Sequence, residues 1–275
     1  MNANGTSLTL SQSIHSNALQ TALTAEALRD RVPAAFAPTA HQRMSSAYTF
    51  ISTERVLSAL ASAGFLPVEA RQAARARSPL YTRHLIRLRR RFETIALRDA
   101  IPEVLFLNSH DGTSAYQLRV GLYRVVCTNG LVVSAGAFPT WRVAHRGDVV
   151  DNVVEAALQI TERFGDLATA IERMERTNLD RLAQLDLAFE ALRLRFPGDP
   201  PGTVEPGQLL VARRPEDLGN DLWRTFNVLQ ENLLHGGFQR RLASNRLRRT
   251  RRITAIREDV RLNSALWELA TARAA

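Results

Sequence analysis

The hydrophobic pattern changes its period once along the chain, and this change restricts the fold to one that combines a sheet with helices. From Tyr81 to Ser134, apolar residues alternate with polar ones or form short runs, with turn sequences at Asp111-Gly112 and Asn129-Gly130. From Val150 to Leu192 they recur every three or four residues, as on the buried face of a helix. This order predicts an α+β fold in which a curled antiparallel sheet follows a short helix and precedes a long one and a C-terminal helical region.

The same patterns predict individual elements. Strands are expected at 81–92, 103–108, 115–127 and 131–134, with a further one at 141–145. Helices are expected from Thr53 to Ala63, at 221–234 and at 257–272. The apolar seam of 150–192 fits one long helix or a helical hairpin packed on its own sheet, and it also fits an intermolecular coiled coil.

Composition along the chain predicts three regions. Residues 1–45 are polar and rich in alanine, which is typical of a flexible N-terminal arm. Residues 46–196 hold the predicted α+β core with its long helix. Residues 197–275 form the predicted C-terminal helical region with a basic loop, and this region begins with a proline- and glycine-rich segment from Pro197 to Gly207.

Positive charge is concentrated in two arginine runs that contain no acidic residue. Eight arginines lie between Arg71 and Arg91 and seven between Arg240 and Arg252, in a chain of net charge +9 that has no lysine. Codon usage in a GC-rich genome would explain arginine in place of lysine, but it would not explain the clustering. Clusters of this kind are typical of proteins that bind polyanions, since neutralised phosphates release counterions. Nucleic acid is therefore the predicted partner.

The composition also excludes several functions. Without lysine there is no Walker-type phosphate loop and no Schiff-base catalysis. The single cysteine, Cys127, excludes an internal disulfide. The sequence shows no secretory signal and no apolar run of membrane-spanning length. We therefore expect a cytoplasmic protein with no cofactor, no metal and no membrane partner.

Several ungapped blocks between Tyr48 and Ala272 resemble a phage- and plasmid-encoded family, domain of unknown function 932. The blocks are Leu105–Tyr116 (LFLNSHDGTSAY), Gly121–Val132 (GLYRVVCTNGLV), His145-Arg146-Gly147, Leu222–Gly237 (LWRTFNVLQENLLHGG) and Arg251–Leu269 (RRITAIREDVRLNSALWEL). The resemblance implies a mobile element and a bacterial host cytoplasm. The order of a helix, Gly64-Phe65, a basic strand, curled hairpins and a long helix is also similar to the core of single-strand annealing recombinases.

Single-stranded nucleic acid is bound by basic grooves with aromatic faces on which bases stack. In a strand over 81–92, period two places several arginines on one face of the sheet as a ladder of guanidinium groups. The candidate nucleic-acid-binding residues of this first run are Arg83, Arg87, Arg89 and Arg91, with Tyr123 or Tyr81 as a stacking platform. Those of the second run are Arg246, Arg248, Arg249, Arg251 and Arg252, for which a merely solvated loop is the alternative.

No catalytic or metal site is predicted. Ser109-His110-Asp111 resembles part of a triad, but neighbours on a tight turn diverge in space. The loose set His84, His110, Cys127 and His145 lacks the spacing of metal ligands. Asn227, Gln230, Glu231 and Asn232 form a polar helical stripe that fits either packing or function.

The sequence therefore predicts a non-enzymatic protein of a mobile element that binds single-stranded DNA, with RNA as a further possibility. Strand annealing without ATP by a homo-oligomer is the predicted role. The alternative is a protein-interaction module that inhibits a host defence or nucleic-acid enzyme. A hydrolase that uses His110 and Asp111 is a third, weaker hypothesis.

Overall fold

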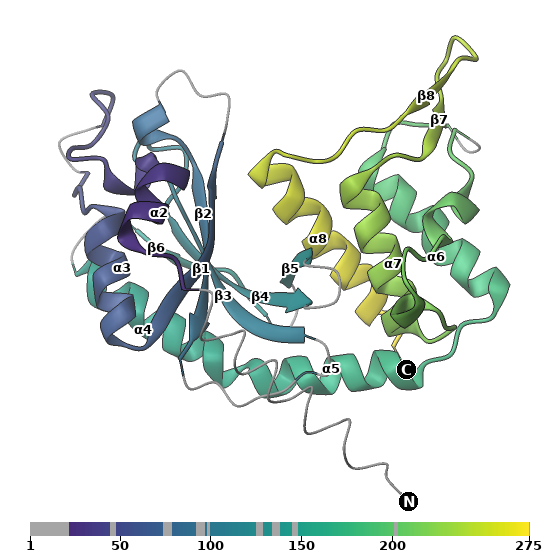
Figure 1. Cartoon of the computed structure of the whole chain (residues 1–275), viewed down its shortest axis with the longest axis horizontal. Coiled ribbons are helices and arrows are strands. Elements are labelled where there is room, and N and C mark those ends of the chain that lie inside the picture. Colours follow the sequence, from purple (N-terminus) through teal and green to yellow (C-terminus); the bar gives the residue numbers. More distant parts are fainter. Residues whose placement is uncertain are drawn as a thin grey trace, which may run out of the picture. The chain divides into compact units, whose positions relative to one another are not determined.

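The computed structural model describes residues 22–44, 48–73, 79–91, 97, 100–124, 129–133, 138–144, 148–200 and 203–274. These residues form two compact units (Figure 1). Unit 1 ends at Gly165 and unit 2 begins at Asp166. The predicted boundary after residue 196 is therefore wrong, because helix α6 (Arg181–Arg195) packs on the helices of unit 2.

Unit 1 is built on one antiparallel sheet. Its strands are β1 (Phe65–Gln72), β2 (His84–Arg90), β3 (Ala100–Asn108), β4 (Tyr116–Arg124), β5 (Asn129–Val133) and β6 (Trp141–Val143). The strand order is β1-β2-β3-β4-β5, and β6 pairs with β4 beside β5. The predicted α+β fold with a curled antiparallel sheet is confirmed.

Two parts of the sheet differ from the sequence prediction. Strand β1 is not predicted, because Pro67 interrupts its pattern, and proline fits only edge strands and bulges. The structure shows both, since β1 lies at the sheet edge and its register shifts between Pro67 and Glu69. Asn129-Gly130 is not a turn, because Asn129 pairs with Arg124 and Gly130 with Tyr123 inside the β4–β5 ladder.

Helices cover one face of this sheet. Helix α3 (Thr53–Ser62) begins at Ser52, whose hydroxyl accepts a hydrogen bond from the backbone N–H of Arg55, and it packs on α4 (Val149–Glu162). Figure 1 shows both on the same side of the strands. On this face His84 of β2 lies 3.0 Å from the Thr53 hydroxyl of α3, and the period of the strand places Ile86 and Leu88 on the same face; all three are fully buried.

Order begins earlier than predicted. Residues 1–21 lie outside the described residues, but α2 (Ala25–Arg31) and the 3-10 turn η1 (Pro33–Phe36) are part of unit 1. Val32, Ala34 and Ala35 are fully buried, and the Leu23 N–H donates to the Pro67 carbonyl at 2.6 Å. The predicted flexible arm of residues 1–45 is therefore wrong for residues 22–44.

The apolar seam of 150–192 forms three helices rather than one. Helix α4 ends at Glu162, α5 (Phe164–Arg176) follows after Arg163, and α6 comes after a short connection. The seam residues face inward, with Val153, Ile160 and Leu167 fully buried. The period of the seam predicts the buried side of these helices, but not the points at which they break.

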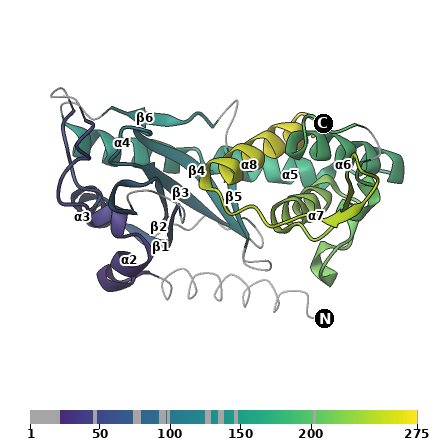
Figure 2. The ribbon, with the colours of Figure 1, turned by 90° about the horizontal axis from the view of Figure 1, so that it is seen from above.

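Unit 2 is mainly helical, as Figure 2 shows. Its elements after α6 are η3 (Pro206–Leu210), η4 (Pro215–Asp217), α7 (Leu222–His235), β7 (Gln239–Arg241), β8 (Leu247–Arg249) and α8 (Ile256–Thr271). Helices α6, α7 and α8 pack on one another around Phe226, whose ring stacks on Trp223 and meets Trp267 edge to face. The predicted helices at 221–234 and 257–272 are confirmed, and the predicted basic loop between them contains a β-hairpin.

Candidate nucleic-acid interface

The first arginine run is largely built into unit 1. Arg87 and Arg89 are only 2% and 6% exposed, and both donate through Nε to Glu103, at 2.5 and 2.8 Å, on opposite oxygens of that carboxylate. Glu103 is fully buried on the neighbouring strand β3. Arg87 also donates to the carbonyl oxygens of Leu122 and Leu131. The predicted ladder of exposed guanidinium groups is therefore wrong for Arg87 and Arg89.

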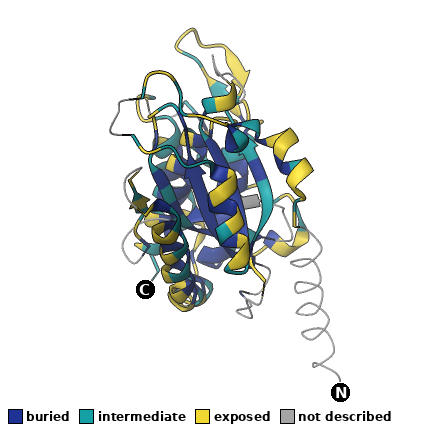
Figure 3. Cartoon of the chain, turned by 90° about the vertical axis from the view of Figure 1, so that its left-hand side faces the viewer, coloured by how far each residue is buried: buried dark blue, intermediate teal, exposed yellow. Residues whose placement is uncertain are grey.

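The physical reason is the position of β2 in the sheet. It pairs with a strand on each side, and all its residues from His84 to Arg89 are buried. Figure 3 shows that most of the sheet is buried (dark blue). A guanidinium group placed there loses its hydration and needs a carboxylate partner. The register supplies one, because β3 brings Glu103 beside Arg87 and Arg89.

The other candidates of unit 1 are only partly accessible. Tyr123 is half-buried, and the Arg89 guanidinium lies 4.5 Å from the centre of its ring. Arg89 therefore occupies the ring face on which a base was expected to stack. Arg83 donates to the Thr113 carbonyl at 2.9 Å, and Tyr81 meets His41 edge to face. Arg91 is exposed. These residues do not form one continuous basic surface with Arg87 and Arg89.

The second run forms a different structure, the basic hairpin, which we define as residues 239–252. In Figure 1 strands β7 and β8 extend away from helices α6, α7 and α8 of their own unit. Six of its arginines are exposed, and within the described residues their side chains have no acidic partner. Arg241 donates to Asn245, and the other five are the candidates Arg246, Arg248, Arg249, Arg251 and Arg252. The structure thus brings the five second-run candidates together on one element.

The basic hairpin is held firmly at its base. The backbone N–H and C=O of Gln239 bond to the side chain of Gln208 at 2.8 and 3.1 Å, and the Arg241 N–H donates to the Thr203 carbonyl at 2.8 Å. Asn245 takes a left-handed backbone conformation at the tip, with φ of 61°. Arg240 forms a two-pronged ion pair with Asp199 at 2.5 and 2.6 Å. Arg240 is therefore neutralised, unlike the exposed arginines of the hairpin.

Arg195 joins the hairpin to the helices. Its guanidinium donates to the carbonyl oxygens of Leu233 and Arg251, and it lies 5.2 Å from the ring centres of both Phe196 and Phe238. Burial lowers the pKa of Arg195 to about 10, so the group stays charged at neutral pH. Arg195 therefore has a structural role. The sequence does not predict this role, because Arg195 lies outside both arginine runs.

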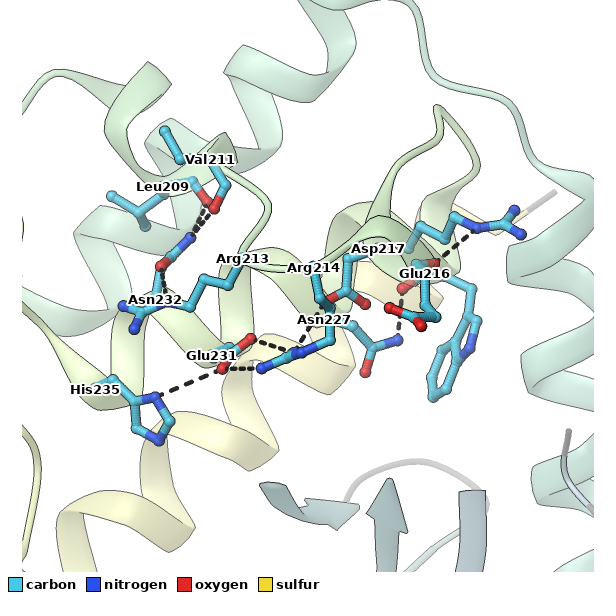
Figure 4. Close-up of polar contacts among 12 residues, drawn as sticks. Leu209, Val211, Arg213, Arg214, Glu216, Asp217, Asn227, Glu231, Asn232 and His235 are labelled. Carbon is cyan, nitrogen blue, oxygen red and sulfur yellow. Dashed lines mark hydrogen bonds and ion pairs between the residues drawn. The ribbon is translucent and has the colours of Figure 1, made fainter. Parts of the chain in front are cut away.

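The polar stripe of α7 is explained by packing. Arg214 forms a two-pronged ion pair with Glu231 at 2.7 Å and also bonds to Asp217 at 2.9 Å (Figure 4). Asn232 donates to the carbonyls of Leu209 and Val211. Asn227 donates to the Trp223 carbonyl, and Gln230 donates to Asn263 of α8 at 2.9 Å. All four stripe residues are buried, and Glu231, Gln230 and Asn232 fix the segment 209–214 and α8 on α7.

The Ser109–Ser114 turn shows no catalytic geometry. Asp111 accepts hydrogen bonds from the N–H and hydroxyl of Thr113 at 3.0 and 2.6 Å. His110 is fully buried and contacts the Thr53 hydroxyl at 3.1 Å. The two side chains thus point to different partners. Cys127 and His145 of the loose metal set lie outside the described residues, and the described residues contain no group of three or more histidines, cysteines or acids that could hold a metal ion.

His84 lies in a buried hydrogen-bond network. Its Nδ1 donates to the Thr82 carbonyl at 3.1 Å, so Nε2 accepts from the Thr53 hydroxyl at 3.0 Å in the neutral ring. Asn108 donates to the same hydroxyl at 3.2 Å. Burial lowers the pKa of His84 from 6.5 to about 4, since an imidazolium would lose both its hydration and its acceptor role.

This pKa shift predicts that acid destabilises unit 1. The unfolded chain takes up the His84 proton below its ordinary pKa of 6.5, whereas the folded state takes it up only near pH 4. The His84 contribution is therefore complete above pH 6.5 and is lost as the pH falls toward 4, by up to about 3 kcal/mol. Urea unfolding at several pH values measures the loss, and NMR titration of the ring identifies its source. A ring that protonates near pH 6.5 in the folded protein would contradict the prediction.

Among the helices of the described residues, none has the length and apolar character needed to cross a membrane.

Comparison with known proteins identifies similar chains. A family model described as "Domain of unknown function (DUF932)" matches residues 40–267. The chain is 41% identical over 253 residues to the UPF0380 protein YafZ of Escherichia coli K12, covering 91% of each chain. It is 40% identical over 251 residues to the UPF0380 protein YfjQ of the same organism, covering 90% of each. No solved structure matches the chain.

Proposed function

The chain belongs to the DUF932 family, and for this member we propose a function as a single-stranded nucleic-acid-binding protein, with DNA as the first substrate. One observation carries the proposal: six exposed arginines, the five candidates and Arg241, lie without acidic partners on a firmly held hairpin. Guanidinium groups bind phosphate oxygens in pairs and release counterions from the strand. The proposed interface is the basic hairpin alone, because Arg87 and Arg89 are buried.

The side chains of the hairpin favour contact with the backbone of the strand over contact with its bases. Residues 239–252 include no aromatic residue, and the preceding Phe238 is only 7% exposed. Leu247 is 57% exposed and offers a small apolar contact. A strand bound in this way keeps its bases accessible for pairing, which supports the proposed role in strand annealing without ATP and without a catalytic step.

A salt titration tests the binding proposal. We expect the affinity for a labelled single strand to fall by orders of magnitude between about 50 and 200 mM salt, because several phosphates are neutralised together. Fluorescence anisotropy with strands of different sequence measures this, and RNA of the same sequence reports the preference between the two nucleic acids. An affinity that does not change with salt would rule out electrostatic capture.

Annealing needs a separate experiment. We expect the protein to accelerate pairing of two complementary oligonucleotides without ATP and in the presence of EDTA, because screening of strand repulsion requires neither. A basic peptide of equal charge is the control for nonspecific condensation. If pairing is no faster with the protein than with the peptide, the annealing proposal is wrong, whereas the binding proposal is unaffected.

Self-association would extend this function along a strand. Strand β1 and the β5–β6 side of the described sheet pair on one side only, and open sheet edges can be covered by a second copy. The proposal is a homo-oligomer, and mass photometry with and without DNA tests it. A monomer under both conditions would remove the oligomer and leave simple binding.

The alternative is a protein-interaction module that inhibits a host defence or nucleic-acid enzyme. The exposed Leu247 among arginines favours it, because interfaces with proteins combine apolar contacts with arginine. The salt titration separates the two functions, since an inhibitor of this kind need not bind a free oligonucleotide.

A further inference from the structure

A pocket of about 630 Å³ opens in unit 2 at the C-terminal end of α7, beside the basic hairpin. Its walls come from three separate segments. They include Arg213 and Val211 before α7, Asn232 and His235 at the end of α7, and Phe238 and Arg249 of the hairpin region. The volume lies in the usual range of small-ligand sites, roughly 300–1,000 Å³.

Arg213 is held in place without being neutralised. Its Nε donates to Oδ1 of Asn232 at 2.9 Å (Figure 4). One terminal nitrogen donates to the Gly236 carbonyl at 3.3 Å. Asn232 is itself fixed by the carbonyls of Leu209 and Val211. Both partners of Arg213 are neutral, whereas the adjacent Arg214 is neutralised by Glu231 and Asp217. Arg213 therefore contributes an oriented positive charge to the pocket.

The surrounding charges are also positive. Arg249 has no acidic partner within the described residues. Burial and the nearby charges of Arg252, Arg213 and Arg214 lower the pKa of His235, although Glu231, at 3.7 Å from its Nδ1, acts in the opposite direction. An anion in this pocket would relieve the repulsion between these cations.

The end of a helix usually repels anions, because its last carbonyls carry partial negative charge. Here these carbonyls are occupied. The Leu233 oxygen accepts from Arg195, the Leu234 oxygen accepts from the Ile253 N–H at 2.8 Å, and the Asn232 oxygen accepts from the Gly236 N–H at 2.9 Å. Gly236 has φ of +67°, and a Cβ there would lie 2.7 Å from the Arg251 carbonyl, so the chain can turn beside the pocket only with glycine.

We propose that this pocket binds a phosphate monoester with a nucleoside body, with Arg213, Arg249 and His235 around the phosphate and Val211 and Phe238 against the nucleoside. The phosphate belongs either to a free nucleotide or to the 5′ end of a nucleic-acid strand. The proposal goes beyond backbone binding by the exposed arginines of the hairpin, because residues of three segments meet around the space for one group. It does not require the hairpin to bind long strands.

The test uses the full chain with deoxyadenosine 5′-monophosphate and with inorganic phosphate as probes. Calorimetry measures affinity, and NMR of the His235 ring reports occupancy of the pocket. We expect the nucleotide to shift the ring signals and to raise the pKa of His235. Oligonucleotides with a 5′-phosphate and with a 5′-hydroxyl then distinguish the sources, because tighter binding of the phosphorylated strand assigns the pocket to strand ends, and equal binding assigns it to free nucleotides.

A matched pair of variants locates the site. Val211 and Leu218 are both exposed aliphatic residues of unit 2, at 61% and 67%, but only Val211 lines the pocket. Val211→Glu should weaken nucleotide binding about tenfold or more by repulsion of the phosphate, and Leu218→Glu should leave it unchanged. Arg213→Lys should also weaken binding, since it keeps the charge but loses the planar group that Asn232 orients.

Two results would overturn the proposal. The first is a His235 signal that does not respond to millimolar nucleotide while phosphorylated and unphosphorylated strands bind alike. The second is equal loss of nucleotide binding in Val211→Glu and Leu218→Glu. Failure of the hairpin function is distinguishable, because it would abolish binding of the 5′-hydroxyl oligonucleotide without changing the response of His235 to the nucleotide.

Discussion

Replacement of Glu103 by alanine is expected to destabilise unit 1 by about 3–5 kcal/mol, because it leaves two buried guanidinium groups without their carboxylate. Arg87 and Arg89 share the two oxygens of Glu103, and all three residues are buried. Hydrogen exchange of the β2 and β3 amides measures the loss within unit 1 itself, independently of unit 2. Exchange should accelerate by a factor of 10² or more.

Glu69 provides the matched control for this prediction. It lies 3.8 Å from the Nε of Arg87 on the opposite side of β2, but it is 42% exposed. Glu69→Ala should therefore cost less than about 1 kcal/mol, as for other exposed ion pairs. If Glu103→Ala destabilises the protein no more than Glu69→Ala does, then Glu103 does not stabilise the two buried arginines as the geometry indicates.

The buried arginines show where prediction from the sequence stops. Alternation along β2 predicts that Arg87 and Arg89 share one face, and the strand is confirmed. Whether that face is covered depends on residues far away in the sequence. The run contains no acid, yet Glu103 reaches both arginines once β3 pairs with β2. A segment without acids in the sequence can therefore be neutralised in space.

Regular elements with strong local signals are predicted well. Asp221 caps α7 by accepting from the Arg224 N–H at 2.9 Å, and the predicted helix begins at that residue. The β7–β8 hairpin is not predicted, because each of its strands has only three residues and their exposed side chains show no apolar alternation. The phosphate pocket is not predicted either, since it combines residues from positions 208 to 249 that only the fold brings together.

For the second run, in contrast, the number of arginines in a short segment is enough to predict an exposed positive charge. Seven arginines lie within residues 240–252, and the structure pairs Arg240 with Asp199. A short hairpin also lacks the second layer that would bury a guanidinium group. The two runs are therefore similar in sequence but differ in their surroundings. Part of the first run lies buried in a sheet, and the second run forms an exposed hairpin.

This difference leads to the prediction with the most direct bearing on function. Replacing Arg246, Arg248 and Arg251 by alanine should weaken binding of a single strand by about a hundredfold at low salt, because three phosphate contacts are lost. The slope of log affinity against log salt should fall by about 2 for the same reason. These three residues do not line the phosphate pocket, so its response to a nucleotide should remain.

The control removes the same charge elsewhere on unit 2. Arg176, Arg193 and Arg257 are exposed helical arginines outside the hairpin. Their triple alanine variant has the same net charge as the hairpin variant, so a general effect of charge on steering would weaken binding equally in both. A much larger loss in the hairpin variant, with an unchanged melting temperature, assigns binding to the hairpin. Equal losses would show that the strand responds only to the net charge of the protein, and the interaction-module function would then explain the hairpin better.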